Sequence, residues 1–374
     1  MIYVDISAAV HARAGLGRYA EQLAGALIAE QPERFGLFYN QGRDGCFPSI
    51  LPTTIPRRTV HFGYKPWRMV ILLAHLSRIP FNRLLPNAKL FHSTEHLLMP
   101  LRNVPTVLTV HDLIYKLYPA YHKKLNYWYL NLAMPLYCRR ANAIIAVSQA
   151  SKRDIVRYYR VDPAKVHVIY EAASPLFSPP PPDRIRHVRH TYGLPDNFLL
   201  HLSTIEPRKN LNRLLDTLLN LRRLFPDLCL ILAGSKGWLT SDFFAKIEAD
   251  GLADVVRPLG WVADEDLPAI IAAATLAVQP SLYEGFGLPI LEHMACGQVV
   301  AASQASAHPE VGGEAAAYFD PENVEGMTAV IRHLLTDKEE YQQRQQLGLH
   351  QAAKFSWQRA ARETLALYEE QLAE

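Results

Sequence analysis

The sequence lacks long hydrophobic runs and is poor in cysteine. Its most apolar stretches, such as 69–76 and 269–278, end well short of the ~18 residues that a membrane-spanning helix needs. The four cysteines are scattered and form no Cys-x-x-Cys pair, which predicts reduced thiols and excludes a disulfide framework. No basic segment precedes the first apolar run at 2–6, so we expect no signal peptide and a cytoplasmic location.

The composition is that of an ordinary globular protein. The chain has 374 residues, of which 49% are hydrophobic and 20% charged. This apolar fraction excludes intrinsic disorder. At roughly 150 residues per domain, the length predicts two domains, each able to bury a core of its own.

The charge is distributed unevenly along the chain. Residues 1–175 contain 22 Lys and Arg against 10 Asp and Glu, whereas residues 176–374 contain 17 against 26. The basic half indicates an anionic partner, which is a nucleic acid, a membrane surface or a phosphorylated substrate, unless two domain surfaces simply differ. Neither a helix-turn-helix, an RNA-recognition motif nor a zinc module supports the alternative of a nucleic-acid-binding protein.

Short β-rich runs alternate with helical patterns through both halves, which predicts parallel sheets built from βαβ units. The expected strands are 2–6, 36–39, 90–92, 107–110, 144–147, 166–169, 198–202, 228–233, 255–258, 276–279 and 299–302. The expected helices are 17–30, 123–140, 149–160, 210–223, 264–273, 289–295 and 358–373.

These elements predict an α/β protein with two doubly wound Rossmann-like domains that face a central cleft. We place the N-terminal domain at 1–177, a proline linker at 178–183 and the C-terminal domain at 184–356. Ser356 is expected to cap a C-terminal helix at 357–374, which packs back on the N-terminal domain. Ligands of such sheets bind beyond the carboxyl ends of the strands.

A glycine-rich segment, Gly15-Leu16-Gly17-Arg18-Tyr19-Ala20, formally matches the dinucleotide fingerprint G-x-G-x-x-A. Residues 7–14 separate it from the first strand, however, and no acidic residue ends the second strand, where a ribose partner belongs. A glycine loop that opens a helix still suits a phosphate. A plain tight turn is the alternative interpretation.

Two segments of the second half carry charged residues at the starts of helices. In Glu206-Pro207-Arg208-Lys209-Asn210, two cations lie beside the positive end of a helix, and a diphosphate would relieve this conflict. The segment 281–292 runs from a strand through Gly285 and Gly287 into a helix. Its carboxylates, Glu284 and Glu292, are eight residues apart and suit pairs of sugar hydroxyls.

The Glu-x7-Glu pattern of Glu284 and Glu292, within Glu-Gly-Phe-Gly-Leu-Pro, resembles the retaining, nucleotide-sugar-dependent enzymes of glycosyltransferase family 4, which have the GT-B fold. The resemblance covers essentially the whole chain. The other segments that match in order are Ala14–Tyr19, Thr109–Asp112, Ala146–Ser148, Glu206–Asn210, Gly260–Val262 and Phe355–Trp357.

The resemblance implies a catalytic set of Glu284, His111, Arg208 and Lys209. Arg208 and Lys209 would hold the donor diphosphate, Glu292 the ribose, and His111 would lie near the reacting sugar. The donor set that it implies is Gly15, Gly17, Arg208, Lys209, Val262, Glu284, Phe286, Gly287, Leu288 and Glu292. It implies no cofactor and no catalytic metal. The diphosphate would leave as the acceptor attacks from the same face, with its charge stabilised by fixed cations.

Two further segments have residue types that occur in metal or acceptor sites. Asp264-Glu265-Asp266 has the spacing of the D-x-D motif that binds metal in another glycosyltransferase fold. Its position at the start of a helix favours N-capping and pairing with the helix dipole instead. The segment His92–His96 follows a strand, which suggests a contribution to the acceptor pocket.

The sequence favours one donor without excluding others, and it indicates only the chemical class of the acceptor. The segment Tyr283–Cys296 resembles mannosyltransferases of bacterial surface-polysaccharide assembly, which favours GDP-mannose; UDP-glucose and UDP-N-acetylhexosamine are the alternatives. Basic and aromatic residues at 64–70 and 121–140 suit an anionic membrane surface and a polyprenyl-diphosphate-linked acceptor. The same stretches also fit ordinary helices that cover a sheet.

Overall fold

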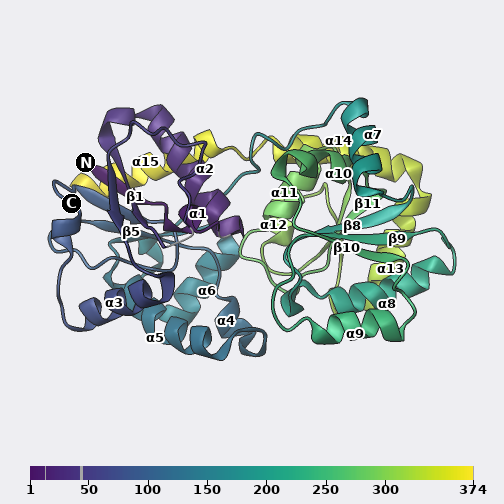
Figure 1. Ribbon diagram of the computed structural model, residues 1–374, viewed down its shortest axis with the longest axis horizontal. Helices are drawn as coiled ribbons and strands as arrows, with labels where there is room; N and C mark the ends of the chain where they lie inside the picture. Colours follow the sequence, from purple (N-terminus) through teal and green to yellow (C-terminus); the bar gives the residue numbers. More distant parts are fainter. Residues whose placement is uncertain (13, 43–44, 374) are drawn as a thin grey trace. The chain divides into compact units, whose positions relative to one another are not determined.

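The computed structural model describes residues 1–12, 14–42 and 45–373, which form two compact units (Figure 1). Unit 1 comprises Met1–Glu171 and Ser356–Glu374, and unit 2 comprises Ala172–Phe355. Each unit contains one parallel sheet covered by helices on both faces, so the predicted pair of doubly wound domains is confirmed.

The sheet of unit 1 has seven strands in the order β3-β2-β1-β4-β5-β6-β7. The chain builds outward from β1 to β3 and then returns to place β4 beside β1, so the strand order reverses between β1 and β4. This reversal creates the crevice in which doubly wound sheets bind ligands. The strands are β1 Ile2–Asp5, β2 Phe35–Asn40, β3 Arg57–Val60, β4 Leu90–Ser93, β5 Thr106–Val110, β6 Ala143–Ala146 and β7 Val166–Val168.

Two helical layers enclose this sheet (Figure 1). One face packs on α3 Tyr64–Leu76 and α5 Lys124–Arg140, whose apolar sides join a large core with the strands. The first helices of the chain, with α15 Trp357–Ala373, lie over the other face. The remaining helices of unit 1 are α1 Ser7–Val10, α2 Ala14–Glu30, α4 Ile114–Leu117 and α6 Gln149–Tyr159.

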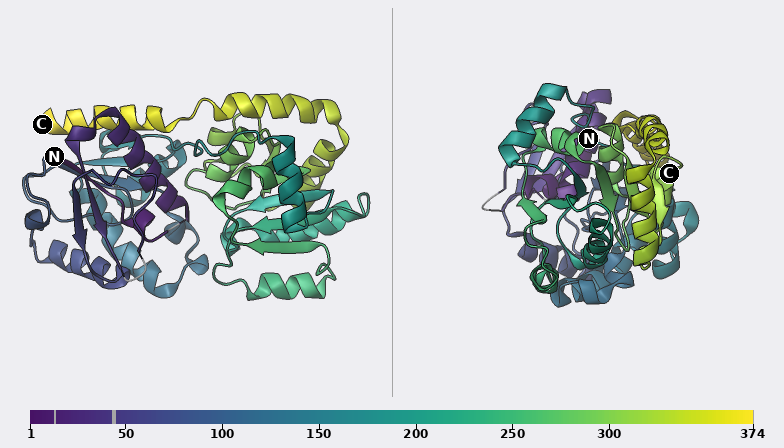
Figure 2. Two further views of the ribbon diagram at one scale, coloured as in Figure 1. Left: turned by 45° about the horizontal axis from the view of Figure 1, so that its top comes forward. Right: turned by 90° about the vertical axis from the view of Figure 1, so that its right-hand side faces the viewer.

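The C-terminal helix returns to unit 1, as predicted. Ser356 caps it, since the backbone N–H of Arg359 donates to Ser356 Oγ at 3.1 Å. The helix, yellow in Figure 2, packs against α2 of the purple N-terminal segment. Its Tyr368 is fully buried and its hydroxyl group is 2.6 Å from His92 Nδ1 in β4.

Unit 2 repeats the design with six strands in the order β10-β9-β8-β11-β12-β13, and its order reverses between β8 and β11. The strands are β8 Phe198–Leu202, β9 Cys229–Ala233, β10 Val256–Gly260, β11 Leu276–Gln279, β12 Val300–Ser303 and β13 Ala317–Phe319. The helices are α7 Pro182–Tyr192, α8 Leu211–Arg222, α9 Ser241–Ala249, α10 Leu267–Ala273, α11 Leu288–Ala295, α12 His308–Gly312, α13 Val324–Thr336 and α14 Lys338–Ala352.

The structure differs from the sequence prediction in several places. Strands β3 and β13 were not predicted, because both are short edge strands and β3 exposes its two arginines. Pro182 begins helix α7, although the proline run was expected to exclude helix; a proline at the first helical position loses no hydrogen bond. The compact units divide between Glu171 and Ala172, a few residues before the predicted linker.

Candidate active site

Charged side chains of unit 2 meet at the crevice between β8 and β11. The segment after β8 forms a single 3₁₀ turn, Pro207–Lys209, and the segment after β11 contains Glu284. These two segments are joined through the backbone, because Leu282 N–H donates to the carbonyl oxygen of Arg208 at 2.8 Å. The pairing of β8 with β11 therefore places Arg208 and Lys209 beside Glu284, which is distant from them in the sequence, at the carboxyl ends of these two strands.

Glu284 lies between Arg208 and Lys209. One carboxylate oxygen is 2.5 Å from Arg208 Nη1, and the other is 2.5 Å from Lys209 Nζ. Arg208 Nε also contacts Glu206 at 2.6 Å. Two carboxylates, Glu206 and Glu284, thus balance the cations that the sequence predicted to need an anion. Charge-assisted hydrogen bonds of this kind fix the positions of Arg208 and Lys209.

The ionisation of this cluster follows from its burial and its charges. Burial alone raises the pKa of Glu284, but the charges of Arg208 and Lys209 lower it, and the net pKa lies well below its ordinary value. Burial and the neighbouring Arg208 lower the pKa of the Lys209 ammonium, while Glu284 opposes this shift. Glu284 is therefore ionised at neutral pH.

Two serines that sequence reasoning missed hold Glu284 in place. Ser281 Oγ donates to Glu284 Oε1 at 2.7 Å, and the backbone N–H of Glu284 donates to Ser306 Oγ at 3.1 Å. The Ser306 hydroxyl in turn donates to the backbone carbonyl of Glu284. Serine is common in loops, so these positions carried no signal in the sequence alone.

Gly287 ends the loop in a conformation that favours glycine. Its φ is +110°, and a Cβ placed there would lie 3.1 Å from Cδ2 of His308. Burial lowers the pKa of His308 to about 4, so its ring is neutral. Its Nδ1 lies 2.9 Å from Ser303 Oγ, a hydroxyl that itself donates to the carbonyl of Ser281. His308 therefore holds Nδ1–H toward Ser303, and it is a site-adjacent residue that the sequence did not identify.

The other predicted donor residues of unit 2 lie on or near α11. Leu288 is the first residue of this helix, and Glu292 is buried within it. Phe286 is buried and its ring packs edge-on against Phe355 at 6.0 Å between centroids. The side chain of Val262 is buried in an apolar core, so a ligand contact at this position would fall to its backbone atoms.

In unit 1, the two predicted glycines lie in the first turns of α2 and differ in their surroundings. A Cβ at Gly15 would meet no atom within 4 Å. A Cβ at Gly17 would lie 3.1 Å from the carbonyl oxygen of Ala8 in α1. Packing of α1 on α2 thus favours glycine at Gly17, because a Cβ there would push against the backbone of Ala8, whereas a Cβ at Gly15 would meet no neighbour.

His111 follows β5 and is buried with both ring nitrogens engaged. Nδ1 is 3.1 Å from a carboxylate oxygen of Glu171, and Nε2 is 2.9 Å from the carbonyl oxygen of Thr94. Burial lowers the pKa of His111, but the hydrogen bond and the charge of Glu171 raise it, and the net shift is upward. Both partners are acceptors, so this geometry suits the imidazolium form, which donates from both nitrogens. Glu171 was missed because it is 60 residues from His111 in the sequence.

The structure refines two of the other expectations. His92 is fully buried between Thr109 Oγ1, at 2.8 Å from Nε2, and the hydroxyl of Tyr368, so its own side chain belongs to the core. A contribution of the rest of the segment His92–His96 to an acceptor pocket stays a prediction. Asp266 does not cap α10 with its side chain. Instead it accepts from Arg184 and from the hydroxyl of Tyr192, both in α7.

Two further findings concern clusters of metal-ligating side chains and membrane-spanning helices in the described residues. Among the residues that the structure describes, no group of three or more His, Cys, Asp or Glu side chains could hold a metal ion. Within the same ranges, no helix is long and apolar enough to cross a membrane.

Two Rossmann-like units, with a cation–carboxylate cluster at the strand reversal of the second, define the class of GT-B glycosyltransferases. Solved structures of other proteins have a similar fold over nearly the whole of this chain. The protein HepE of Anabaena, solved with UDP and glucose, is 21% identical and has a TM-score of 0.75, with 98% of this chain and 99% of that chain covered. Sucrose-phosphate synthase of Thermosynechococcus elongatus is 20% identical with a TM-score of 0.79, covering 100% and 99%.

The chain belongs to glycosyltransferase family 4. The family model "Glycosyltransferase Family 4" matches residues 13–174, and "Glycosyl transferases group 1" matches residues 187–350. The chain is 31% identical to O-antigen chain mannosyltransferase B of Escherichia coli over 95% of both proteins. It is 32% identical to the serotype-specific mannosyltransferase WbdA of Escherichia coli over 70% of this chain, which spans 33% of that relative. The protein is therefore a glycosyltransferase of the kind that uses nucleotide-sugar donors.

Proposed function

We propose that this enzyme transfers a hexose, with mannose favoured, from a nucleoside-diphosphate sugar, with GDP-mannose favoured, to a saccharide or lipid-linked saccharide, and that it retains the anomeric configuration. The observation that carries the proposal is the cluster of Arg208, Lys209 and Glu284 at the strand reversal of unit 2. Similarity to an O-antigen mannosyltransferase over 95% of the chain supports mannose.

The roles that we propose for the residues are those that the resemblance to glycosyltransferase family 4 implies, and the charges of the cluster support the role of Arg208 and Lys209. Arg208 and Lys209 hold the donor diphosphate and stabilise the charge that develops as the sugar–phosphate bond breaks, which is the kind of effect that is usually largest in catalysis. Glu284 and the backbone of 286–288 hold the donor sugar, and Glu292 accepts from the ribose hydroxyls. Gly15, Gly17 and His111 of unit 1 complete the proposed set, and no step requires a metal.

A direct test compares donors. Transfer or hydrolysis is measured with GDP-mannose, UDP-glucose and UDP-N-acetylglucosamine, and binding is measured by thermal shift. A donor at ~100 times its Kd stabilises the protein by roughly 2.7 kcal/mol, which is easily detected. Response to GDP-mannose alone supports the proposal, and response to a UDP-sugar alone replaces it with the UDP-dependent alternative.

The site assignment is tested by Lys209→Ala and Glu292→Ala. Each variant should lower turnover by at least about 100-fold, because single donors or charges aimed at a transition state are worth about 10²–10³ in rate. Glu322→Gln, which removes an exposed carboxylate of unit 2, should leave turnover unchanged. Wild-type turnover in either site variant, with the donor still bound, would refute the assignment.

We also propose that unit 1 contacts the cytoplasmic face of an anionic membrane, where a polyprenyl-diphosphate-linked acceptor would lie. Two stripes of exposed apolar residues, one on α3 and one on α5, support this proposal. Leu125 and Trp128 of α5 are 78% and 69% exposed. The stripes consist of Met69, Leu73 and Leu76 on α3, and Leu125, Trp128 and Leu132 on α5.

Both stripes lie on the outer side of the same helical layer. The two helices are joined by Arg68, whose guanidinium group lies over the ring of Tyr129 at 3.9 Å and donates to Asn126 at 2.8 Å. Their core-facing sides belong to one cluster with the sheet. Successive residues of a helix are ~100° apart, so the three residues of each stripe lie within a narrow arc. This arc is on the exposed side of the helix, away from the core.

The charge of this region matches an anionic surface. From Gly45 to Arg153 the sequence has fifteen Lys and Arg but only two acids, Glu95 and Asp112, and neither is an exposed residue. Exposed basic residues with interfacial aromatics bind anionic bilayers. Trp128→Ala/Leu132→Ser should weaken sedimentation with phosphatidylglycerol vesicles, whereas Leu224→Ser, at an exposed leucine of unit 2, should not.

A further inference from the structure

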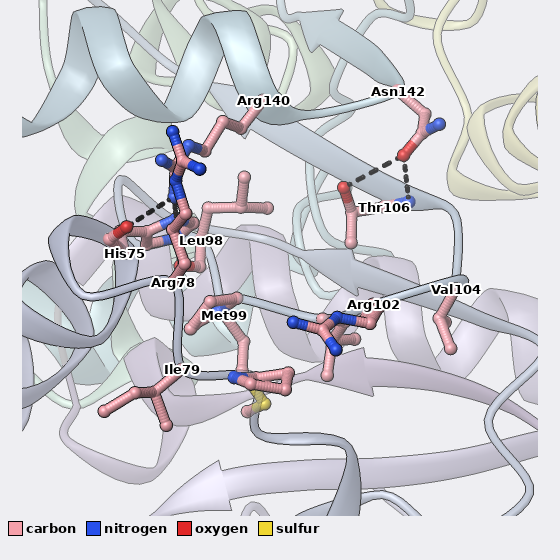
Figure 3. A pocket seen from close by; sticks show the side chains of 13 residues that line it. His75, Arg78, Ile79, Leu98, Met99, Arg102, Val104, Thr106, Arg140 and Asn142 are labelled. Atoms are coloured by element: carbon pink, nitrogen blue, oxygen red, sulfur yellow. Dashed lines mark hydrogen bonds between the residues drawn. The ribbon is translucent and has the colours of Figure 1, made fainter.

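Unit 1 contains a pocket at the amino-terminal ends of β5 and β6, whereas His111 follows the carboxyl end of β5. Its volume is about 380 Å³, within the usual range of small-ligand sites, and its lining includes Thr106 and Asn142 (Figure 3). Thr106 begins β5, and Asn142 directly precedes β6. His111 follows the other end of β5, roughly 15 Å away at ~3.3 Å per residue. The pocket is therefore separate from the candidate active site.

Three arginines from three different segments line this pocket: Arg78 after α3, Arg102 in the loop before β5, and Arg140 at the end of α5 (Figure 3). Among the described residues that line it, none is acidic. Within the described ranges, no ion pair involves Arg78, Arg102 or Arg140. All three are exposed residues, so water screens part of their mutual repulsion, and an anion bound between them would interact favourably with all three charges.

Arg140 is held in place by an uncharged histidine. Its Nη1 donates to the carbonyl oxygen of His75 at 2.7 Å and lies 3.0 Å from His75 Nδ1. His75 Nε2 is 2.7 Å from the carbonyl oxygen of Leu98, so this nitrogen carries the proton and Nδ1 accepts. Burial lowers the pKa of His75 to about 4, which keeps the ring neutral at physiological pH. The guanidinium charge of Arg140 thus stays available to a ligand.

The segments that carry the other two arginines are also fixed. Arg78 lies two residues after the last residue of α3, in the left-handed region with φ +57°, where glycine is favoured. The next N–H, of Ile79, donates to the carbonyl of Ala74 at 2.9 Å. Asn82 clamps the backbone of Arg102, since it donates to its carbonyl at 2.9 Å and accepts from its N–H at 3.0 Å. The backbone that carries Arg78 and Arg102 is therefore held in place by hydrogen bonds within unit 1.

We propose that this pocket binds a phosphate group, supplied by the head group of an anionic lipid. Planar guanidinium groups recognise phosphate oxygens in bidentate geometry. The apolar side of the ligand would meet Ile79, which lines the pocket and is exposed, and Leu76, which is exposed in the last turn of α3. The choice of a lipid as the source rests on the proposed membrane contact, whereas the phosphate site itself does not.

The test separates recognition in the pocket from general attraction between charges. Arg78→Lys/Arg102→Lys keeps both charges but loses the bidentate geometry. The matched control is Arg58→Lys/Arg153→Lys, at two exposed arginines of unit 1 that lie outside the pocket. Binding is measured by sedimentation with vesicles of phosphatidylcholine containing phosphatidylglycerol, and by calorimetry with inorganic phosphate. Thermal unfolding and donor binding report whether each variant is folded.

The expected result is at least a tenfold loss of vesicle binding in the pocket variant and no change in the control. A loss confined to inorganic phosphate also supports the pocket and makes a soluble phosphate its source. Wild-type binding of both probes by the pocket variant would overturn the proposal, as would a wild-type protein that binds neither probe. Donor turnover is measured separately, so failure of the proposed reaction would not be mistaken for failure of this site.

Discussion

Replacement of Glu284 by glutamine should destabilise the ligand-free enzyme and make it more responsive to a diphosphate. The carboxylate contacts Arg208 and Lys209 at 2.5 Å each and accepts from Ser281 at 2.7 Å. Glutamine preserves the volume but removes the charge. Lys209 would then be a buried cation without its ionic partner.

The size of the effect follows from the burial of the pair. Removal of one partner of a buried ion pair costs about 3–5 kcal/mol. Arg208 retains 22% exposure of its side chain and keeps its contact with Glu206, so we expect about 2–4 kcal/mol. In a unit of 150–250 residues, each kcal/mol lowers the Tm by roughly 2–4 °C. The transition of unit 2 should therefore fall by about 5–15 °C.

Calorimetric unfolding with and without GDP or UDP measures both parts of this prediction. The diphosphate replaces the missing negative charge, so the nucleotide should raise the Tm of Glu284→Gln more than that of the wild type. Glu322→Gln, an exposed change of the same charge, should unfold like the wild type. A Glu284→Gln transition within about 1 °C of this control, or a smaller nucleotide response than the wild type, would contradict this prediction.

Three further predictions concern unit 1. The pKa of His111 is raised in the folded state, so protonation of this histidine stabilises the fold. The stabilisation is complete below the ordinary histidine pKa of about 6.5 and is lost as pH rises through the pKa of the folded state. His111→Gln should therefore lower the free energy of unfolding more at pH 6 than at pH 9. Gly17→Ala should destabilise by about 1–3 kcal/mol through overpacking, whereas Gly15→Ala should stabilise slightly and, if a donor phosphate approaches there, lower turnover. Tyr368→Phe leaves His92 without its hydroxyl partner and should lower the free energy of unfolding by about 1–3 kcal/mol in denaturant titrations.

Several features of the candidate site could be predicted from short stretches of sequence. The segment 281–292 has the glycines, the proline and the apolar periodicity of a strand-to-helix loop, and the structure places Gly287 at the start of α11 with a positive φ. The alternation of strands and helices likewise indicated the two parallel sheets. Helices such as α14, in which few side chains are buried, were not predicted, because their sequences contain little apolar periodicity.

The local conformation of the chain was thus determined by its sequence, because backbone preferences and the period of apolar residues act over a few residues. The tertiary structure alone decided which charges meet. Glu284 lies between two cations 75 and 76 residues away because β8 and β11 are neighbours at the strand reversal, and His92 is buried by a tyrosine 276 residues away. The three arginines of the pocket come from separate segments in the same manner. Burial and electrostatic fields are sums over residues that are distant in the chain, so a short stretch of sequence does not contain them.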